Sequence, residues 1–416
     1  MSDMEILVIP ITFSLITFFL YRKKGVSTIC KFIIAFWAAM SLFSYLFYIH
    51  PSFEYSVHSE GKVSYVASIY LIICACLWFF PLAFLKQAKK TYIIDENVFK
   101  LFALFTLVIT IGTSIILIPE AIRGINLIDF AANKENAISG NLSSINTTIK
   151  RLFFIPYTYL NFLFPLLAMY SLSIGKKGYF LLFLCMSIIP IILLTFATSS
   201  RNYITYVIFE LLVAFFLLKD SLSSQTRKKV YVSLLFFFIL FSVLMISFSA
   251  RRFSANQSDV YTGDFMILKY TGEGISNFNI LLYNNAGKNC DGDLNFPLVR
   301  KWLGMRYSED SMERRAYWSG RLNYSNYLFY TFIGSLVSDF GLEYGVILSL
   351  IVCFIFSWII IRRRGYWSTV YLGYLLASFY MKGVFYNPYQ SLADNYVLLF
   401  LVIVYFVLRF IEVKRI

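Results

Sequence analysis

Long apolar runs alternate with short polar connections along almost the whole chain. A helix that crosses a bilayer needs roughly 20 apolar residues, and runs of about that length recur throughout. Because backbone groups in lipid must be paired within their own segment, we expect each run to be a helix. The pattern predicts about eleven spans (10–12), each roughly a bilayer in length, over 6–21, 30–49, 63–85, 100–118, 153–174, 179–198, 203–218, 230–249, 342–361, 366–385 and 395–411.

One long segment, from Ala250 to about Tyr327, interrupts this pattern with mostly polar residues. Unpaired backbone is costly in lipid, so the segment must lie outside the bilayer or line a wet cavity. The sequence therefore predicts an all-α, polytopic membrane protein with one large exterior loop. Its predicted parts are eight spans over 1–249, including a smaller exterior loop at 119–151, then the large loop over 250–327 and the last three spans over 328–416.

The composition agrees with a membrane protein and orients it. Hydrophobic residues make up 59% and charged residues 14% of the chain, with a mean hydropathy of +0.68, whereas roughly 25% of residues are charged in soluble domains. The net charge is +14, and basic clusters such as 22–31 and 362–364 fall in alternate connections. The positive-inside rule then places the N-terminus outside and the C-terminus inside. The charge thus needs no nucleic-acid partner.

Metal and disulfide motifs are scarce. Cys290 is the one cysteine in the large loop, so we expect no disulfide framework there. The two histidines, His50 and His58, share one short exterior loop, which argues against a histidine metal site. Asp291-Gly-Asp293 has the form that many glycosyltransferases use to hold a divalent metal, but it is also typical of a solvated turn. We predict no metal and no other cofactor.

Arginines on the outer side are candidates for binding an anion. Arg201 begins the returning helix of a tight hairpin, where backbone N–H groups assist anion binding. Arg251 and Arg252 are adjacent guanidiniums suited to a phosphate or pyrophosphate. The alternative for all three is contact with lipid phosphate. Arg123 and Arg321 are further candidates.

The stretch 296–318 is predicted to form an amphipathic surface helix. Its aromatic side chains, which include Trp302, Tyr317 and Trp318, either stack on sugar rings or lie among lipid headgroups. The headgroup interpretation is favoured. Glu210, in the middle of an apolar run, is a separate functional candidate because carboxylates inside a membrane are costly.

Three stretches resemble the Wzy-type O-antigen polymerases, a family that joins oligosaccharide repeat units. They are residues 198–202 (TSSRN), the segment that Arg251 and Arg252 begin, and residues 326–345, which contain Asp339-Phe-Gly. As topology the resemblance covers most of the chain. Some family members carry an Arg-x10-Gly spacing in two periplasmic loops. Here only Arg252 to Gly263 has it outside the membrane, so a paired-loop mechanism is not supported.

The resemblance implies a location in the bacterial inner membrane, with the N-terminus periplasmic and the C-terminus cytoplasmic, and is compatible with a GT-C-like architecture. It implies a glycosyltransferase that takes a glycan linked through pyrophosphate to undecaprenyl lipid. The enzyme transfers it to the non-reducing end of another lipid-linked unit. Implied partners are this lipid-linked oligosaccharide, membrane lipid, a chain-length regulator and a flippase.

Residue roles follow from that chemistry. The leaving group is already activated, so the main needs are charge stabilisation on pyrophosphate and orientation of the acceptor. The five arginines named above would stabilise the charge. Asp339 is the first candidate for the general base and Glu273 and Glu120 are its rivals, although Asp339 also suits a helix cap. Expected glycan-binding residues are Tyr270, Asn277, Asn279, Trp318 and Tyr324.

Other function classes remain as alternatives. A lipid-linked oligosaccharide flippase or another transporter needs no long exterior loop and usually shows internal repeats, and none is visible here. An O-antigen ligase shares the leaving group, but the ligases that the chain resembles use a histidine in the large loop. This chain has no histidine after His58. A non-catalytic assembly protein of the membrane is the fourth class.

Overall fold

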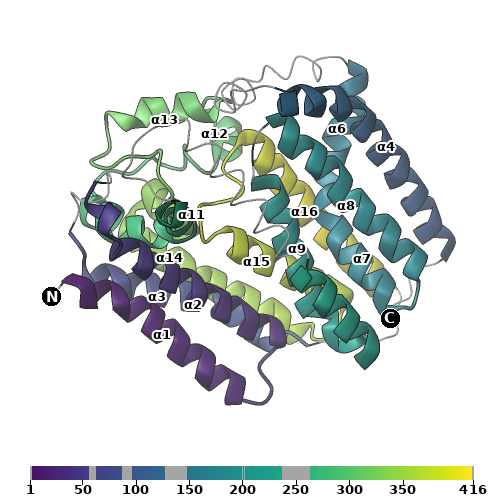
Figure 1. Cartoon of the computed structure of the whole chain (residues 1–416), viewed down its shortest axis with the longest axis horizontal. Coiled ribbons are helices and arrows are strands. Elements are labelled where there is room, and N and C mark those ends of the chain that lie inside the picture. Colours follow the sequence, from purple (N-terminus) through teal and green to yellow (C-terminus); the bar gives the residue numbers. More distant parts are fainter. Residues whose placement is uncertain are drawn as a thin grey trace. The chain divides into compact units, whose positions relative to one another are not determined.

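The computed structural model of the chain describes residues 2–55, 62–86, 96–126, 148–198, 200, 202–236 and 263–414. The regular structure of these residues is helical, which confirms the predicted all-α class (Figure 1). Within them, eight helices are long and apolar enough to cross a membrane. The chain is therefore a multi-pass membrane protein.

The helices group into two compact units. Unit 1 comprises Met1–Ala88 and Ser258–Ile416, and unit 2 comprises Lys89–Gln257. The predicted three-part division follows the order of the chain, whereas these units follow packing. Packing joins the first three long helices to the polar segment and to the last three helices.

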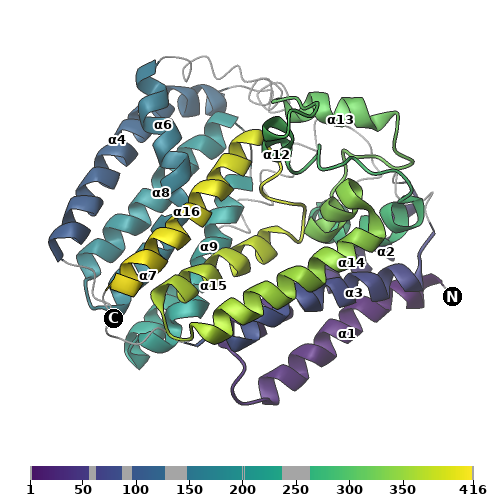
Figure 2. The ribbon, with the colours of Figure 1, turned by 180° about the vertical axis from the view of Figure 1, so that it is seen from behind.

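Unit 1 contains nine α-helices and four short 3-10 or π-helical segments among its described residues. These helices are α1 (Ser2–Arg22), α2 (Thr28–Tyr48), η1 (Pro51–Tyr55), α3 (Tyr65–Phe79) with η2 (Phe80–Phe84), α11 (Gly263–Asn277) with the π-helical η6 (Phe278–Leu282) and η7 (Tyr283–Asn285), α12 (Pro297–Trp302), α13 (Ser311–Ser319), α14 (Thr331–Arg362), α15 (Trp367–Lys382) and α16 (Leu392–Lys414). In both views α1, α2, α3 and α14 lie side by side (Figures 1 and 2).

Unit 2 is built around the pair α4 and α8. Its described helices are α4 (Glu96–Asn126), α6 (Thr148–Leu160), η4 (Asn161–Leu163), α7 (Phe164–Ser173), α8 (Lys177–Thr198), α9 (Asn202–Leu218), η5 (Lys219–Ser221) and a helix over 224–236. Gly124 lets α4 approach α8 so closely that a Cβ atom there would overlap the carbonyl oxygen of Phe196. Tyr157 of α6 donates a hydrogen bond to the Met186 carbonyl of α8 at 3.2 Å.

Several predicted spans differ from the helices in length. The predicted span 203–218 is α9, with 17 residues, and the span 366–385 is α15, with 16, so both are shorter than the roughly 20 residues that cross a bilayer. The predicted span 342–361 extends back to Thr331, because the 32-residue α14 includes the stretch before it. The predicted span 230–249 lies largely outside the described residues.

Trp37 lies at the centre of unit 1. Its fully buried indole donates a hydrogen bond to the Tyr380 carbonyl at 3.0 Å. Its ring packs at 6.1 Å from Phe13, 5.2 Å from Phe79 and 6.0 Å from Phe332, measured between ring centroids. One aromatic cluster therefore joins α1, α2, α3, α14 and α15, and these helices form a common base for the polar segment.

The first part of the predicted exterior loop is packed into this base. Phe265, Ile275 and Phe278 of α11 and η6 are buried. A Cβ atom on Gly272 would lie 2.5 Å from the Ser44 Cα atom, so α11 touches the backbone of α2. The predicted amphipathic helix over 296–318 is two short helices instead, α12 and α13, because Gly304 takes a left-handed φ of 67° between them.

Helix α14 is broken two residues after Asp339. Gly341 has φ 85° and ψ 173°, outside the helical region, and its position is crowded by the Asn289 side chain. The break releases backbone groups from the helical ladder. The Ser338 carbonyl, before the break, accepts from the Cys290 N–H at 3.0 Å, and the Leu342 carbonyl, after it, accepts from the Tyr70 hydroxyl of α3 at 2.7 Å. The part of α14 that precedes Gly341 packs against the polar segment.

Candidate functional site

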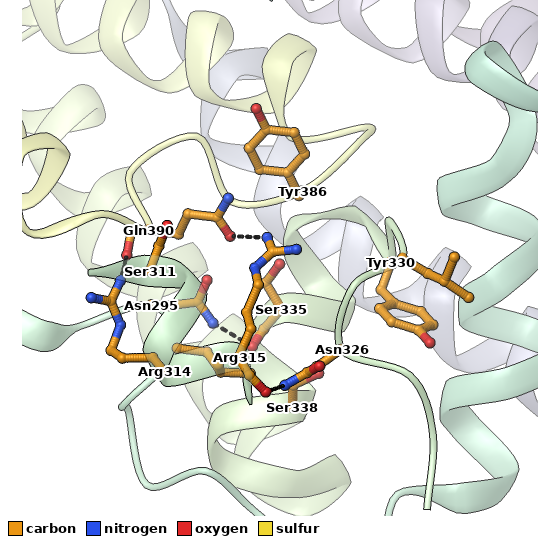
Figure 3. Close-up of a pocket in the computed structure, with 12 residues that line it drawn as sticks. Asn295, Ser311, Arg314, Arg315, Asn326, Tyr330, Ser335, Ser338, Tyr386 and Gln390 are labelled. Atoms are coloured by element: carbon orange, nitrogen blue, oxygen red, sulfur yellow. Dashed lines mark hydrogen bonds between the residues drawn. The ribbon is translucent and has the colours of Figure 1, made fainter. Parts of the chain in front are cut away.

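A polar cavity lies in unit 1 where α13, the loop at 294–295, residues 326–330 and the loop at 386–390 meet the first turns of α14 (Figure 3). Its volume is about 40 Å³. Because one buried water needs roughly 10–15 Å³, this is space for about three or four waters. The cavity therefore fits one small polar group, such as a phosphate-sized anion, and not a whole sugar ring.

Helix α13 contributes two adjacent arginines to the cavity. The Asp310 carboxylate caps the helix by accepting from the Met312 N–H at 2.8 Å. One turn later, Arg314 is 2% exposed and donates to three carbonyl oxygens: Ser308 at 2.6 Å, Glu309 at 3.2 Å and Gln390 at 3.0 Å. Burial lowers the pKa of Arg314, yet a guanidinium stays charged in proteins. Arg314 thus holds α13 against the 386–390 loop and adds positive charge.

Arg315 is half-buried and points toward the same space (Figure 3). Its Nη2 atom donates to the side-chain oxygen of Gln390 at 3.3 Å, and burial lowers its pKa. Within the described ranges, neither Arg314 nor Arg315 forms an ion pair with a carboxylate. The charges of Asp293, Asp310 and Asp339 offset part of the cost of burying Arg314, so a bound anion would mainly offset the cost of the half-buried Arg315 charge. The electrostatics of the cavity therefore suit an anion.

Asp339, the first candidate for the general base, is fully buried in the part of α14 that precedes Gly341. Its Oδ1 atom accepts from the Leu294 N–H at 3.2 Å. Its Oδ2 atom accepts from the Asn295 N–H at 3.0 Å and from the Asn295 side-chain amide at 2.7 Å. Both oxygens are occupied by donors from one loop. These contacts favour an anchoring role, in which Asp339 holds the 294–295 loop to α14.

Glu273, the rival base, is buried on α11 and has fewer partners. The Asn277 amide donates to its Oε1 atom at 3.3 Å and to the Phe329 carbonyl at 3.1 Å. Burial raises the pKa of Glu273 to about 7, against the lowering effects of Lys269 and of the Asn277 hydrogen bond. Tyr330 lines the cavity, and burial, together with the nearby charges of Tyr324 and Glu273, raises its pKa. A carboxyl that titrates near neutrality can accept a proton.

The predicted glycan-binding residues are dispersed. Asn279 is buried and bound to α3, since its amide donates to the Ser64 carbonyl at 2.9 Å and to the Ser68 hydroxyl at 2.6 Å. Trp318 donates to Asp293 at 2.8 Å. Tyr324 is buried with its ring 5.7 Å from that of Tyr330, next to the cavity. Asn277 supports Glu273, as described above, and Tyr270 is half-buried on α11.

The predicted pyrophosphate clamp is only partly visible. Arg201, Arg251 and Arg252 lie outside the described residues. Arg123 belongs to unit 2, where its Nη1 atom lies 3.4 Å from the Glu120 carboxylate. Arg321 stacks on Tyr317 with its guanidinium carbon 3.6 Å from the ring centroid, outside the cavity.

The acidic pair Asp291 and Asp293 has other partners. Asp293 Oδ2 accepts the Trp318 hydrogen bond, and Oδ1 lies 3.4 Å from Arg300 Nε. Asp291 has a left-handed φ of 50°, as expected of a turn. In the described part of the chain, no group of three or more potential ligands gathers around a metal-sized space. The contacts thus favour the turn interpretation of this motif.

Arg314 and Arg315 are not among the binding residues predicted from the sequence. Their signal was present, because Arg314-Arg315 is a tandem pair like Arg251-Arg252. It was hidden in a stretch interpreted as an amphipathic surface helix. Asn295 and Gln390, which complete the cavity, carry no distinguishing local pattern.

Comparisons with protein-family models, with curated proteins and with solved structures give no match to this chain.

Proposed function

We propose that this protein is a membrane-embedded glycosyltransferase that polymerises oligosaccharide repeat units carried on undecaprenyl pyrophosphate. The observation that carries the proposal is the Arg314–Arg315 pair, which brings one buried and one half-buried positive charge to one cavity, neither of them in an ion pair among the described residues. The cavity adjoins α14, a helix long enough to span a membrane. A lipid-linked pyrophosphate is an anion that lies at the membrane surface.

The reaction needs one bond formed and one broken. The hydroxyl oxygen at the non-reducing end of the acceptor unit bonds to the anomeric carbon of the donor glycan. The bond from that carbon to the pyrophosphate oxygen breaks, and undecaprenyl pyrophosphate leaves with the electron pair. The hydroxyl proton passes to a base. Positive charge held in place at the pyrophosphate stabilises the transition state, because the negative charge develops there.

Arg315 is the residue we assign to the leaving pyrophosphate. It is the less constrained of the two guanidiniums, with one side-chain partner, whereas Arg314 is held by three carbonyl oxygens. Arg314 then positions α13 and adds to the potential in the cavity. An arginine pair with a purely structural role needs no bound anion. The proposed role differs because it requires a positive charge that no carboxylate of the protein neutralises.

Glu273 is the residue we assign as general base. Its buried carboxyl, with a pKa of about 7, is substantially deprotonated at neutral pH and can take the acceptor proton. In this proposal Asp339 orients the 294–295 loop and takes no proton. The rate of polymerisation should then rise as pH increases through about 7. Glu273→Gln should lower the rate by roughly 10²–10⁴-fold, the usual contribution of a general base.

The proposal is tested with purified protein and purified lipid-linked repeat units. Incubation should yield a ladder of longer glycans and release undecaprenyl pyrophosphate. In cells, deletion of the gene should leave lipopolysaccharide capped with a single repeat unit. A long-chain ladder that persists in the deletant would refute the polymerase function. Movement of repeat units across vesicles without any polymer would instead identify a transporter.

The site is tested separately from the function. Arg315→Gln keeps the side-chain length and a hydrogen-bonding end but removes the charge, so polymer formation should fall by at least about 10²-fold, as for loss of one oxyanion-stabilising group. Lys288→Gln is the matched control, because Lys288 is an exposed cation of the same segment that does not line the cavity. Equal activity in both variants would remove Arg315 from the mechanism and leave the polymerase function standing.

A further inference from the structure

A short tip after α12 displays apolar side chains on a fixed backbone. The tip consists of Trp302, Leu303, Gly304 and Met305. The Leu303 N–H donates to the Val299 carbonyl at 3.0 Å, and the Met305 N–H donates to the Arg300 carbonyl at 2.9 Å. Gly304 supplies the left-handed φ of 67° that turns the chain. The tip is therefore a closed turn.

Arg300 secures the base of this tip. Its Nε atom donates to the Arg306 carbonyl at 2.8 Å, and its Nη1 atom donates to the Asp291 carbonyl at 2.8 Å. Its Nε atom also lies 3.4 Å from the Asp293 carboxylate, and the side chain is only 11% exposed. A buried arginine with this many partners holds the two ends of the turn together. The position of the tip is thus determined by the fold of unit 1.

The apolar side chains of the tip point outward. Trp302 is 61% exposed, Leu303 68% and Met305 41%. Single exposed apolar residues are common on soluble surfaces, but three large ones on one rigid turn form a patch. Such a patch marks an interaction surface with an apolar partner.

The place of the tip in the fold indicates which apolar medium it meets. The Leu298 N–H, one turn before the tip, donates to Asn395 on α16 at 3.3 Å, and the Asn395 amide donates back to the Asn295 carbonyl at 3.0 Å. Lys301 lies near Tyr396 of the same helix. Both views place α12 at the end of α16 that lies away from the C-terminus (Figures 1 and 2). Since α16 is long enough to span a membrane, the tip lies where that span meets the membrane surface.

Two arginines beside the tip are stacked on one tyrosine. The guanidinium carbon of Arg306 lies 3.3 Å and that of Arg321 3.6 Å from the Tyr317 ring centroid. Two guanidiniums this close to one ring must lie on opposite faces, because on one face they would overlap. Both arginines are exposed, and among the described residues neither forms an ion pair with a carboxylate. Stacking on an aromatic ring holds both charges in place, ready for an exposed anion.

We propose that the 302–305 tip inserts into the membrane surface and that the Arg306–Tyr317–Arg321 stack binds the phosphate of an anionic phospholipid headgroup beside it. An apolar face next to cations is the pattern of segments that lie in the headgroup region. The occupant is the lipid surface that surrounds α16. This attachment would hold the polar segment, and with it the cavity, at a set depth relative to the bilayer.

Insertion is tested by a probe on the tip. Leu303→Cys is made in a full-length variant whose six native cysteines are replaced, labelled with an environment-sensitive fluorophore and placed in phosphatidylcholine–phosphatidylglycerol nanodiscs. Ala316→Cys, an exposed position on α13, is the matched control. Lipids with a quencher near the top of the acyl chain should quench the Leu303 probe at least about twofold more strongly, because interfacial segments lie ~5–10 Å deep. Equal quenching at the two sites, as for a tip that faces water or a protein partner, overturns the insertion.

Headgroup binding is tested on protein that keeps its cysteines. Native mass spectrometry should find that Arg306→Gln with Arg321→Gln retains at most about half of the phosphatidylglycerol kept by the unmodified chain, because the phosphate contacts are charge-assisted. Lys288→Gln, an exposed cation off the stack, should retain all of it. Equal loss in both variants overturns the stack as the binding group. Neither experiment needs glycan substrate, so its result is independent of the proposed polymerase function.

Discussion

Replacing Asp339 tests how the polar segment is held to the membrane helices. Three N–H groups, those of Leu294 and Asn295 and the Asn295 side-chain amide, converge on this one buried carboxylate at 2.7–3.2 Å. Asp339→Ala removes the acceptor and leaves all three donors in a protein interior. Asp339→Asn keeps the shape but offers one oxygen, which can satisfy the two Asn295 donors while its own N–H₂ group faces the Leu294 N–H.

The magnitudes follow from the number of unsatisfied donors. A buried donor without a partner costs roughly 1–3 kcal/mol, so Asp339→Asn should destabilise the segment by about that much. Asp339→Ala leaves three such donors and should cost roughly 3–9 kcal/mol, reduced where water can enter. Asp339→Ala with Asn295→Ala should cost less than the sum of the single variants, because the two side chains contact each other and one substitution removes a donor that the other leaves unpaired.

The assay is limited proteolysis of the loop around Leu294 in detergent, combined with the thermal unfolding temperature. Cleavage should be fastest in Asp339→Ala, slower in Asp339→Asn and slowest in the unmodified chain. The remaining polymerisation should follow the folded fraction, with an unchanged pH profile. Unchanged cleavage in Asp339→Ala would refute the anchoring role. Full loss of activity in Asp339→Asn with unchanged stability would instead make the carboxylate the catalytic base.

Three further predictions concern Glu273, Arg315 and Gly272. The folded state raises the pKa of Glu273 from 4.5 to about 7, so its stabilising effect is complete below pH 4.5 and is lost as pH rises through 7. Between pH 4 and 8 this changes the free energy of unfolding by on the order of 3 kcal/mol. Glu273→Gln should flatten this pH dependence, and an unchanged slope would contradict the prediction. Arg315→Lys keeps a charge but not the planar fork, so polymerisation should fall less than in Arg315→Gln; identical rates would contradict a charge role. Gly272→Ala places a Cβ atom 2.5 Å from Ser44 Cα, which should cost about 1–3 kcal/mol of stability. Gly287→Ala is the control and should be neutral, because open space surrounds Gly287. Equal unfolding temperatures of the two variants would refute tight α11–α2 packing.

Local pattern was sufficient for the spans and the helical class. The apolar runs at 6–21, 30–49 and 179–198 correspond to α1, α2 and α8 within a few residues. Their length and composition are properties of neighbouring residues, and lipid leaves a helix as the only way to pair the backbone. The same reasoning failed at α12 and α13, because the apolar and basic side chains of 296–318 resemble one amphipathic helix even though Gly304 turns the chain.

The sequence by itself thus determined a helical membrane protein with one long polar segment, but only the tertiary structure decided which polar groups meet. Arg314 reaches the Gln390 carbonyl across 76 residues, and Asn295 reaches Asp339 across 44. No periodicity reports such contacts, because they depend on how the break at Gly341 and the packing of α11 against α2 bring distant loops together. Desolvation is also a tertiary effect. It raises the pKa of Glu273 to about 7, and it lowers the pKa of Arg315, which forms no ion pair among the described residues.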